Sequence, residues 1–497
     1  MARKQRKKRG SGKFRKPRQA KAAWTNGESL QKAFAWLLPD AGIFAKVPLH
    51  GNISWAASSL VILALCWSWS EARHVTDAFT DAAGWCQSLL GCSPLTTYQG
   101  FMGALATWTP RLMPIVVGVL QQRMADLGGR FYRIAGWVPI AFDGSRSTAP
   151  RTTSNEQEFC AKNYGQGKTA KYRKKKSQGM RRTKNERKPA QPQEPQAWIT
   201  MLWHMGLRLP WDWRLGPSNA SERDHVIEMI EQGRFPAQTL LCGDAGFVGY
   251  RFWSCLQHAG LRFLVRVGGN VSLLTEQAHC KFEKVGKEFS VLCWPKDALR
   301  ADRPPLRLRL VRVVVGKTLM WLLTNVLDPR ALSQSMVVRF YQMRWGVELE
   351  FRGLKQTLER AKLRCRNAQR LLAELHWSIV AMAVAELLAL KEQLELRPSK
   401  NQTTQETRYD PSQRSLANTM RALRGCLKNL GAEPKPGKDL ASLLRTAVTD
   451  AYQRTSSKKA RYRPPNPDNK PLGDPQIRRL DPDEKQALKR FGSKEAA

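Results

Sequence analysis

The spacing of apolar residues divides the chain into an N-terminal helical part and a longer part in which strands and helices mix. Between residues 28 and 135 the apolar pattern is helical, and a Gly-Cys-Ser-Pro break at 91–94 precedes Thr97, which suits a helix start. The pattern predicts helices at Leu30–Leu38, Trp55–Ser68, Ala72–Leu90, Tyr98–Thr107 and Pro114–Leu127.

Short apolar runs replace this pattern from Gly136 onward. The expected strands are Trp137–Asp143, Ala197–Met205, Leu207–Leu215, Gln238–Asp244 and Arg262–Val267, with helices at Ser221–Gly233 and Phe247–Ala259. Two of the runs end on an aspartate followed by glycine, at Asp143 and Asp244. An acid at the end of a buried strand can present a metal ligand at a sheet edge, or it can simply open a turn.

A second group of strands precedes the last helices. Between 268 and 324 the pattern predicts a β-rich insert, with strands at Glu288–Trp294, Leu306–Val315 and Leu319–Thr324. Helices are expected at Ser333–Lys362, Ala368–Leu396, Gln413–Leu430 and Lys438–Gln453. The proline-rich end, RPPNPDNKPLGDPQIRR, is expected to be largely disordered.

Charge points to a polyanionic partner. The 497 residues contain 82 Lys and Arg against 41 Asp and Glu, a net charge of +41, which favours nucleic acid. Residues 1–22 carry eleven of these cations and no acid, as expected of a disordered arm that neutralises phosphates. The basic segment 162–196 is predicted to be a mobile insertion that either grips DNA or only aids solubility.

Cysteine usage and hydrophobicity favour an intracellular protein outside the membrane. The ten cysteines form no Cys-x2-Cys pair, which fits a reducing compartment and argues against a zinc knuckle. The apolar stretch Ile53–Trp69 contains four serines and is shorter than a typical membrane span of ~20 residues. We expect it to be a buried core helix; a membrane-surface protein is the alternative.

Four polar residues share one face of the helix expected at Ser333–Lys362. At about 100° per residue, Tyr341, Arg344, Glu348 and Lys355 fall within an arc of roughly 60°. A solvated stripe with one Arg–Glu pair would have the same appearance. However, the spacing Tyr-x2-Arg-x3-Glu-x6-Lys resembles the signature of a large branch of bacterial insertion-sequence transposases, in the DDE transposase/integrase superfamily.

This resemblance implies a catalytic site. Glu348 would be the third catalytic carboxylate after Asp143 and Asp244, and together they would hold two Mg²⁺ ions, for which Mn²⁺ can substitute. Tyr341, Arg344 and Lys355 would hold the DNA backbone at the transposon end. The implied fold class is α/β: an RNase H-like mixed sheet with flanking helices, interrupted by the β-rich insert, with a helical N-terminal domain and a helical and disordered C-terminal region.

The region of similarity is roughly 137–396, and it includes Trp321 on the β insert. Related cut-and-paste transposases stack an aromatic residue at the matching position on a flipped base while a hairpin forms. A tryptophan buried in a β core beside Leu322 and Leu323 is the alternative. The N-terminal helices resemble no family pattern, so they suit either recognition of DNA ends or a scaffold.

The expected function is cleavage of transposon ends and joining of their 3′-hydroxyls to target DNA, by a homodimer that bridges two ends in the bacterial cytoplasm at the nucleoid. The partners would be double-stranded terminal repeats and target DNA, without a membrane. An RNase H-like nuclease without strand transfer and a non-catalytic DNA-binding protein derived from a transposase are alternatives. The expected domains are an arm (1–27), an N-terminal helical domain (28–135), a catalytic core in two parts (136–267 and 325–396), the insert (268–324) and a C-terminal region (397–497).

Overall fold

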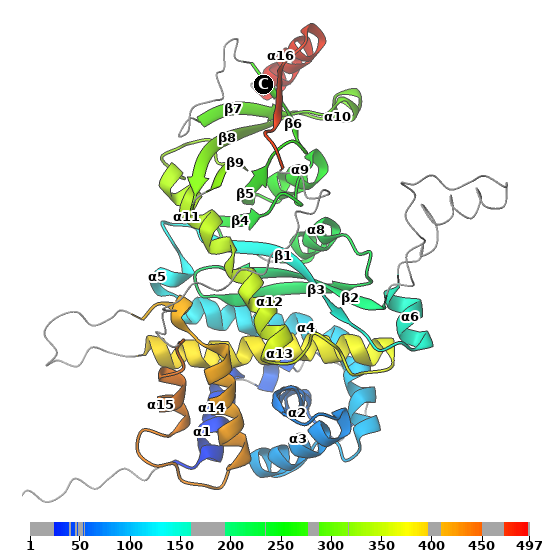
Figure 1. Cartoon of the computed structure of the whole chain (residues 1–497), viewed down its shortest axis with the longest axis vertical. Helices are drawn as coiled ribbons and strands as arrows, with labels where there is room; N and C mark the ends of the chain where they lie inside the picture. The colour runs from blue at the N-terminus through cyan, green and yellow to red at the C-terminus, as the bar shows by residue number, and fades with distance from the viewer. Residues whose placement is uncertain are drawn as a thin grey trace, which may run out of the picture.

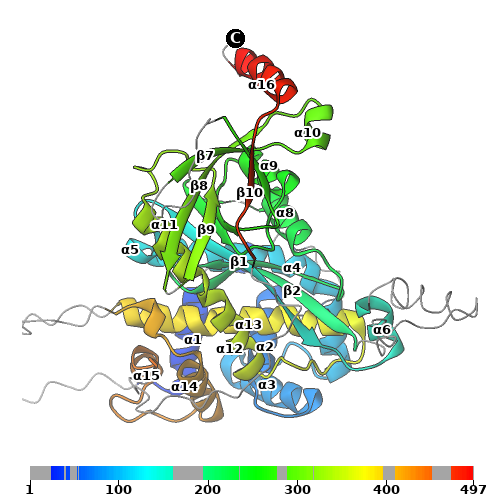
Figure 2. The ribbon, with the colours of Figure 1, turned by 45° about the horizontal axis from the view of Figure 1, so that its top comes forward.

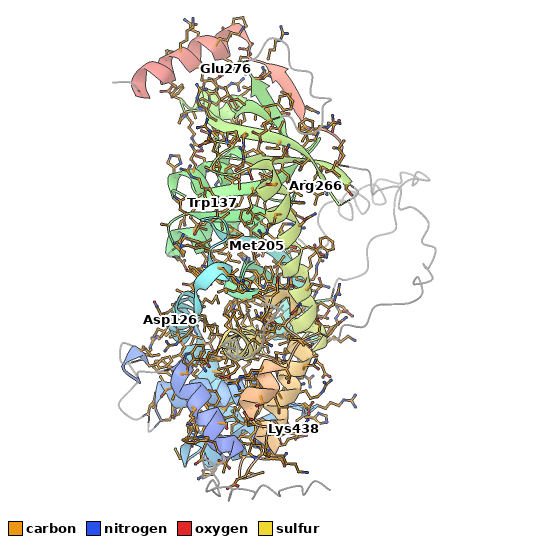
Figure 3. All side chains as sticks on the ribbon, turned by 90° about the vertical axis from the view of Figure 1, so that its left-hand side faces the viewer. Asp126, Trp137, Met205, Arg266, Glu276 and Lys438 are labelled. Atoms are coloured by element: carbon orange, nitrogen blue, oxygen red, sulfur yellow. The ribbon has the colours of Figure 1, made fainter. Side chains whose placement is uncertain are left out.

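The computed structural model describes residues 24–495 except 39–40, 45–46, 48–52, 54, 161–193, 234, 277–287, 317, 396–408 and 450–471. The molecule is elongated, with helices gathered at one end and a sheet at the other (Figure 1). In the side view, Lys438 and Asp126 mark the helical end, Met205 and Trp137 the middle, and Glu276 the far end of the sheet (Figure 3). The predicted arm up to residue 23 and insertion from 162 to 193 lie outside the described residues.

Helices from both ends of the chain form the helical end of the molecule (Figure 1). They are α1 (Asn26–Leu37), α2 (Ala57–Trp69), α3 (Val75–Leu90), α4 (Tyr98–Leu127), α13 (Ala368–Leu394), α14 (Leu416–Lys428) and α15 (Leu440–Arg445). The core-helix prediction for Ile53–Trp69 is confirmed, because eleven residues of α2 are buried. The helix is apolar on all sides because neighbouring helices surround it.

One long helix replaces the two predicted between Tyr98 and Leu127. Thr97 caps α4 by accepting a hydrogen bond from the backbone N–H of Gly100, and the helix continues through Pro110 and Pro114. Proline removes a backbone hydrogen bond inside a helix, which is why the sequence suggested a break. The buried face of α4, including Leu112, keeps the helix continuous by packing against the other helices.

The strands of the described residues form one ten-stranded sheet, in the order β10-β6-β7-β8-β9-β5-β4-β1-β2-β3 (Figure 2). The first five in the chain are β1 (Val138–Thr148), β2 (Gln196–His204), β3 (Leu209–Gly216), β4 (Thr239–Gly243) and β5 (Arg262–Val267). β1, β2 and β3 pair antiparallel, whereas β4 lies parallel to both β1 and β5. This mixed sheet with flanking helices is the predicted fold class.

The β-rich insert extends the same sheet. Its strands are β6 (Ser272–Thr275), β7 (Glu288–Cys293), β8 (Leu306–Val315) and β9 (Thr318–Thr324), and β9 pairs antiparallel with β5. β8 and β9 pair antiparallel as a hairpin, with Val315 opposite Thr318 and Gly316 at a φ of +63°.

The end of the chain is more ordered than the sequence predicted. Residues Gln476–Arg479 form β10, parallel to β6, and α16 (Pro482–Glu495) follows. The prediction of a largely disordered segment up to Arg479 was therefore wrong for Gln476–Arg479, whereas residues 463–471 of that segment lie outside the described residues. The few apolar side chains in and after β10, such as Ile477 and Leu480, gain stability only by packing on the insert.

Helices cover both faces of the central strands. Alternate residues of β1 point to opposite faces. Phe142 packs against Phe247, with ring centroids 4.4 Å apart, on the side of α8 (Glu222–Gln232) and α9 (Tyr250–His258). Asp143 faces the other side, which carries α11 (Gln334–Arg344) and α12 (Gly346–Gln356). The remaining short helices are η1 (Ala41–Phe44), α5 (Gly129–Tyr132), α6 (Thr153–Phe159), α10 (Lys296–Arg300) and η2 (Pro411–Gln413).

Two of the described helices, α4 and α13, are long and apolar enough to cross a membrane. For α13, 89% of the apolar window is buried inside the protein, where it packs against α4, α2, α14 and α15. For α4 the buried share is 44%. The hydrophobicity of α13 is therefore accounted for by the core that it forms.

Candidate active site

Two parallel strands bring Asp143 and Asp244 to the same level. β1 pairs with β4 in a register that sets Ala141 opposite Cys242, and Asp244 directly follows the last residue of β4. Continuing this register by two residues places Asp143 level with Asp244. Gly243 permits the close approach of the strands, because a Cβ there would lie 2.2 Å from the Phe142 ring.

Asp143 does not end its strand, contrary to the prediction. β1 continues to Thr148, and Asp143 pairs with Met201 of β2. The parallel pairing with β4 nevertheless stops at Ala141. Asp143 therefore lies just beyond the parallel ladder, where the sheet edge is open on one side.

The signature residues lie on two helices instead of one. Ser333 caps α11 at the predicted start, a turn at Trp345 separates α11 from α12, and α12 ends at Gln356 instead of continuing to Lys362. Gly346, the first residue of α12, packs tightly against Trp203 of β2: an added Cβ would lie 2.1 Å from the indole ring. This contact fixes the start of the helix that carries Glu348.

Arg344 lies between two of the candidate acids. Its Nη1 is 3.5 Å from Asp143 Oδ2, and its Nη2 is 3.6 Å from Glu348 Oε1. The Arg344 side chain is 6% exposed, against 18% for Asp143 and 36% for Glu348. The helix face predicted from spacing therefore does turn toward the end of β1.

The pKa of Asp143 is raised to about 6, chiefly because burial disfavours its charged form. A hydrogen bond from the Gly144 N–H and the charge of Arg344 lower it, while the charges of Asp244 and Glu348 raise it. The three predicted acids thus influence one another electrostatically, and Arg344 offsets part of their repulsion.

The other two signature residues, Tyr341 and Lys355, also lie near Asp143 and Arg344. Lys355 Nζ donates a 2.7 Å hydrogen bond to Ser145 Oγ, two residues beyond Asp143 on the same face of β1. Tyr341 is buried, and the Arg344 guanidinium carbon lies 5.5 Å from the centre of its ring. All four signature residues therefore gather along the carboxyl-terminal half of β1.

Trp321 lies elsewhere in the sheet. It belongs to β9, is 4% exposed, and donates a 2.7 Å hydrogen bond from Nε1 to Asp474 Oδ1 in the segment before β10. Its ring also contacts Phe289, with ring centroids 6.1 Å apart. In this conformation the indole is covered by the C-terminal segment, so its role in stacking on a base stays a prediction.

Sequence reasoning missed Glu222 as a neighbour of these acids. It is the first residue of α8, and its carboxyl group lies against Gly144, where an added Cβ would be 1.9 Å from Glu222 Oε1. Burial first, and then the charges of Asp143 and Asp244, raise its pKa to about 7. Acids are common in the first turn of a helix, so the sequence carries no signal that singles it out.

Among the described residues, no three His, Cys, Asp or Glu side chains are gathered closely enough to hold a metal ion. Asp143 and Glu348 each lie beside one terminal nitrogen of the Arg344 guanidinium. Carboxylate oxygens are nevertheless the donors that a hard cation such as Mg²⁺ prefers.

Comparisons with known proteins concern this same region. Residues 139–384 match the family model of the transposase DDE domain. No curated protein matches the chain. The chain is similar to a solved structure, the cryo-EM structure of the piggyBac transposase synaptic complex with hairpin DNA, at 13% identity and a TM-score of 0.38, over 86% of this chain and 87% of that chain. The match to the transposase DDE domain, which spans Asp143, Asp244 and Glu348, supports a DDE transposase family for this chain.

Proposed function

We propose that this protein is the transposase of a bacterial insertion sequence, which cleaves DNA at the element ends and joins the 3′-hydroxyl ends to target DNA. The observation that carries the proposal is that Asp143 of β1 and Glu348 of α12 approach the two terminal nitrogens of one buried guanidinium. Asp244 is level with Asp143 in the sheet. Acids set against one another in this way cost stability, which is typical of a site built for a cation.

The proposed cofactor is a pair of Mg²⁺ ions, with Mn²⁺ able to substitute. When bound, such ions would supply activation of the attacking oxygen and stabilisation of the leaving oxygen. Asp143, Asp244 and Glu348 would hold them, and their donor chemistry fits because carboxylate oxygen is the preferred ligand of Mg²⁺. The elevated pKa of Asp143 fits as well, since an added cation would relieve the repulsion that contributes to it.

In this proposal Arg344 exchanges its two carboxylate partners for a DNA phosphate. In the structure its guanidinium is paired with Asp143 and Glu348. The Arg344 guanidinium would contact a phosphate of the DNA end when the two acids serve as metal ligands. Lys355, now hydrogen-bonded to Ser145, and Tyr341 would position the same DNA strand.

The proposed partners are double-stranded DNA, as terminal inverted repeats and as target, and a second copy of the chain that bridges two ends. The net charge of +41 supports the DNA partner, because released counterions drive the binding of basic proteins to phosphates. We place the protein in the bacterial cytoplasm, bound to the nucleoid.

The test uses the full-length protein, duplexes that carry the element's own ends, Mg²⁺ and a plasmid target. Asp143→Asn, Asp244→Asn and Glu348→Gln are expected to keep DNA binding and lose cleavage, whereas Glu158→Gln, an exposed acid of α6, should cleave normally. Near-normal cutting by any of the three variants would remove that residue from the site. Joining of a pre-cleaved end to the plasmid separates a transposase from a nuclease that only hydrolyses.

A further inference from the structure

A pocket of about 480 Å³ lies where the central strands, the β insert and the end of the chain meet. Its walls come from α8, the start of α9, β6, the segment between β7 and α10, and β10, toward the sheet end of the molecule (Figure 1). This volume is within the range of about 300–1,000 Å³ that is usual for pockets that hold a small ligand. None of the candidate acids or signature residues lines it.

The charge of the pocket is positive. Three of the residues that line it are cations, namely Arg223 of α8, Lys296 of α10 and Arg478 of β10, and none of the described lining residues is an aspartate or a glutamate. Arg478 is already paired, because its Nη1 donates a 2.8 Å hydrogen bond to Oε2 of Glu484. Arg223 and Lys296 are exposed, and no acid in the described part of the chain forms an ion pair with either. Two uncompensated cations therefore face the same pocket, which favours an anionic ligand.

The guanidinium of Arg223 is held in place without losing its charge. Its Nη1 donates a 2.8 Å hydrogen bond to the carbonyl oxygen of Val248, which also lines the pocket. A neutral carbonyl orients the guanidinium, and the other N–H groups stay available to an acceptor. An arginine fixed in this way loses less conformational freedom when it binds a phosphate than a freely moving one does.

The pocket adjoins the chain just beyond one of the candidate acids. Asn270, which lines the pocket, donates a 2.9 Å hydrogen bond from Nδ2 to the carbonyl oxygen of Ala245. Ala245 directly follows Asp244, and Val248 in the pocket wall belongs to the same loop after β4. A DNA strand that passes Asp244 can therefore continue toward the pocket along this loop.

The remaining wall is suited to the apolar parts of a nucleotide. The hydroxyl of Tyr250 donates a 2.6 Å hydrogen bond to the carbonyl oxygen of Pro304, and the Trp294 Nε1–H donates one of 2.8 Å to that of Arg303. With these polar groups already bonded, the two side chains offer the pocket their apolar carbon atoms. Phosphate beside a sugar and a base combines the charge and the apolar surface that such a pocket takes.

We propose that this pocket binds a phosphate of a DNA strand that extends from the candidate active site past the end of β4. The proposal rests on the proposed function, because DNA is the partner in both. It gives the β insert a part in DNA binding: the insert and α10 supply Lys296, while the core supplies Arg223.

The test measures the affinity of the full-length protein for a duplex that carries the element's end, without divalent metal, in KCl between about 0.05 and 0.2 M. In Arg223→Gln/Lys296→Gln both charges are removed, while the glutamine at 223 can still donate to Val248. The affinity should fall roughly tenfold, and the slope of log affinity against log salt should become shallower by about one unit, because one phosphate contact is lost. The control Arg251→Gln/Arg300→Gln removes the same charge from exposed positions of α9 and α10 outside the pocket, and it should keep the wild-type slope.

A charge-preserving variant separates the loss of charge from a change of packing. Arg223→Lys/Lys296→Arg should keep the wild-type slope. A loss of affinity as large as that of the glutamine variant would show that packing is responsible, and it would overturn the phosphate site. Equal slopes in the glutamine variant and in the control would overturn it as well.

Titration with deoxythymidine monophosphate in a calorimeter distinguishes a DNA strand from a free nucleotide. If the wild type binds this nucleotide, the glutamine variant does not, and the DNA slopes are equal, the pocket serves a free nucleotide and the assignment to DNA is wrong. Cleavage assays test the proposed function separately. If cleavage depends on Asp143 while the slopes are equal, only the pocket assignment fails; if Asp143→Asn still cleaves, the proposed catalytic site fails, and the pocket is judged on the slopes alone.

Discussion

Arg344 on α11 and Asp143 on β1 form an ion pair of 3.5 Å in which the arginine is the more deeply buried partner. The same guanidinium is 3.6 Å from Glu348, so one arginine pairs with two acids. A buried charge is costly unless it is paired, and here each partner supports the other. Arg344 therefore occupies the role that the proposed metal ions would take over.

Replacing this arginine should destabilise the metal-free protein and increase its response to metal. Arg344→Gln is expected to lower the free energy of unfolding by roughly 1–3 kcal/mol, less than for a fully buried pair because both acids are partly exposed. Added Mn²⁺ should then raise the melting temperature of the variant more than that of the wild type, since the cation replaces the lost positive charge. Thermal unfolding with and without Mn²⁺ measures both effects. An equal response in the two proteins would show that Arg344 and the metal do not share these acids.

The contact between Gly346 and Trp203 is expected to be intolerant of a single methyl group. In Gly346→Ala the new Cβ would lie 2.1 Å from the indole, which is held in place by a 3.2 Å hydrogen bond from its Nε1 to Glu350. Overpacking of this kind typically costs about 1–3 kcal/mol, and movement of α12 should also displace Glu348 and lower DNA cleavage. Gly84→Ala is the control: nothing lies within 4 Å of its added Cβ on the exposed side of α3, so it should stabilise by up to about 1 kcal/mol.

The parts of the fold that depend on local pattern were predictable. β5 and β8 have the bounds expected from their apolar runs, and Asp244 follows its strand because Gly243 and Asp244 interrupt the hydrophobic sequence. Helical spacing alone predicted that Arg344 and Glu348 share one face. The two residues remain one turn apart on that face, although the helix breaks at Trp345. These features are encoded within a few consecutive residues.

The parts that depend on distant partners were not predictable. The Gly-Ser-Arg-Ser run after Asp143 resembles a turn, but β2 supplies a long partner that keeps it extended. The break at Trp345 reflects the fit of Gly346 against Trp203, and β10 forms only because β6 offers an edge. The contact of Glu222 with Gly144 was not predictable either, because no local pattern indicates it.

The buried His204 should make stability depend on pH. It is fully buried, its Nδ1 accepts a 3.1 Å hydrogen bond from the Leu207 N–H, and burial lowers its pKa from 6.5 to about 3. Because the folded-state pKa lies below the unfolded value, this contribution is fully present above pH 6.5 and is lost as the pH falls toward 3. The loss can reach about 4–5 kcal/mol.

Urea unfolding at several pH values between 4 and 7 measures this dependence. His204→Asn retains an acceptor for the Leu207 N–H but cannot titrate, so it should be less stable at pH 7 and should show a shallower loss of stability toward pH 4. A variant with the same slope as the wild type would show that another group controls the acid response.

Variants of Trp321 can distinguish a role in packing from a role in the DNA reaction. Its ring is buried beside Phe289, and its N–H bonds to Asp474. Trp321→Phe should keep most of the packing and lose only the hydrogen bond, at a cost of about 1 kcal/mol. Asp474→Ala should cost a similar amount, and the double variant little more than either alone, because both changes remove the same bond. Chemical unfolding of the four proteins completes this cycle.

The activities of Trp321→Ala then decide between the two roles. Truncation of a buried tryptophan to alanine typically lowers the free energy of unfolding by roughly 3–5 kcal/mol. If Trp321 has only a structural role, this loss of stability should lower the nicking and hairpin rates together. Stacking on a flipped base is worth about 1–3 kcal/mol, so that role predicts a hairpin rate reduced by a further one to two orders of magnitude relative to first-strand nicking. The base could reach the ring only after the segment around Asp474 moves away, so Asp474→Ala should not slow hairpin formation. Equal losses in nicking and hairpin rates, or the absence of any hairpin product, would leave Trp321 as a core residue whose partner is the C-terminal segment.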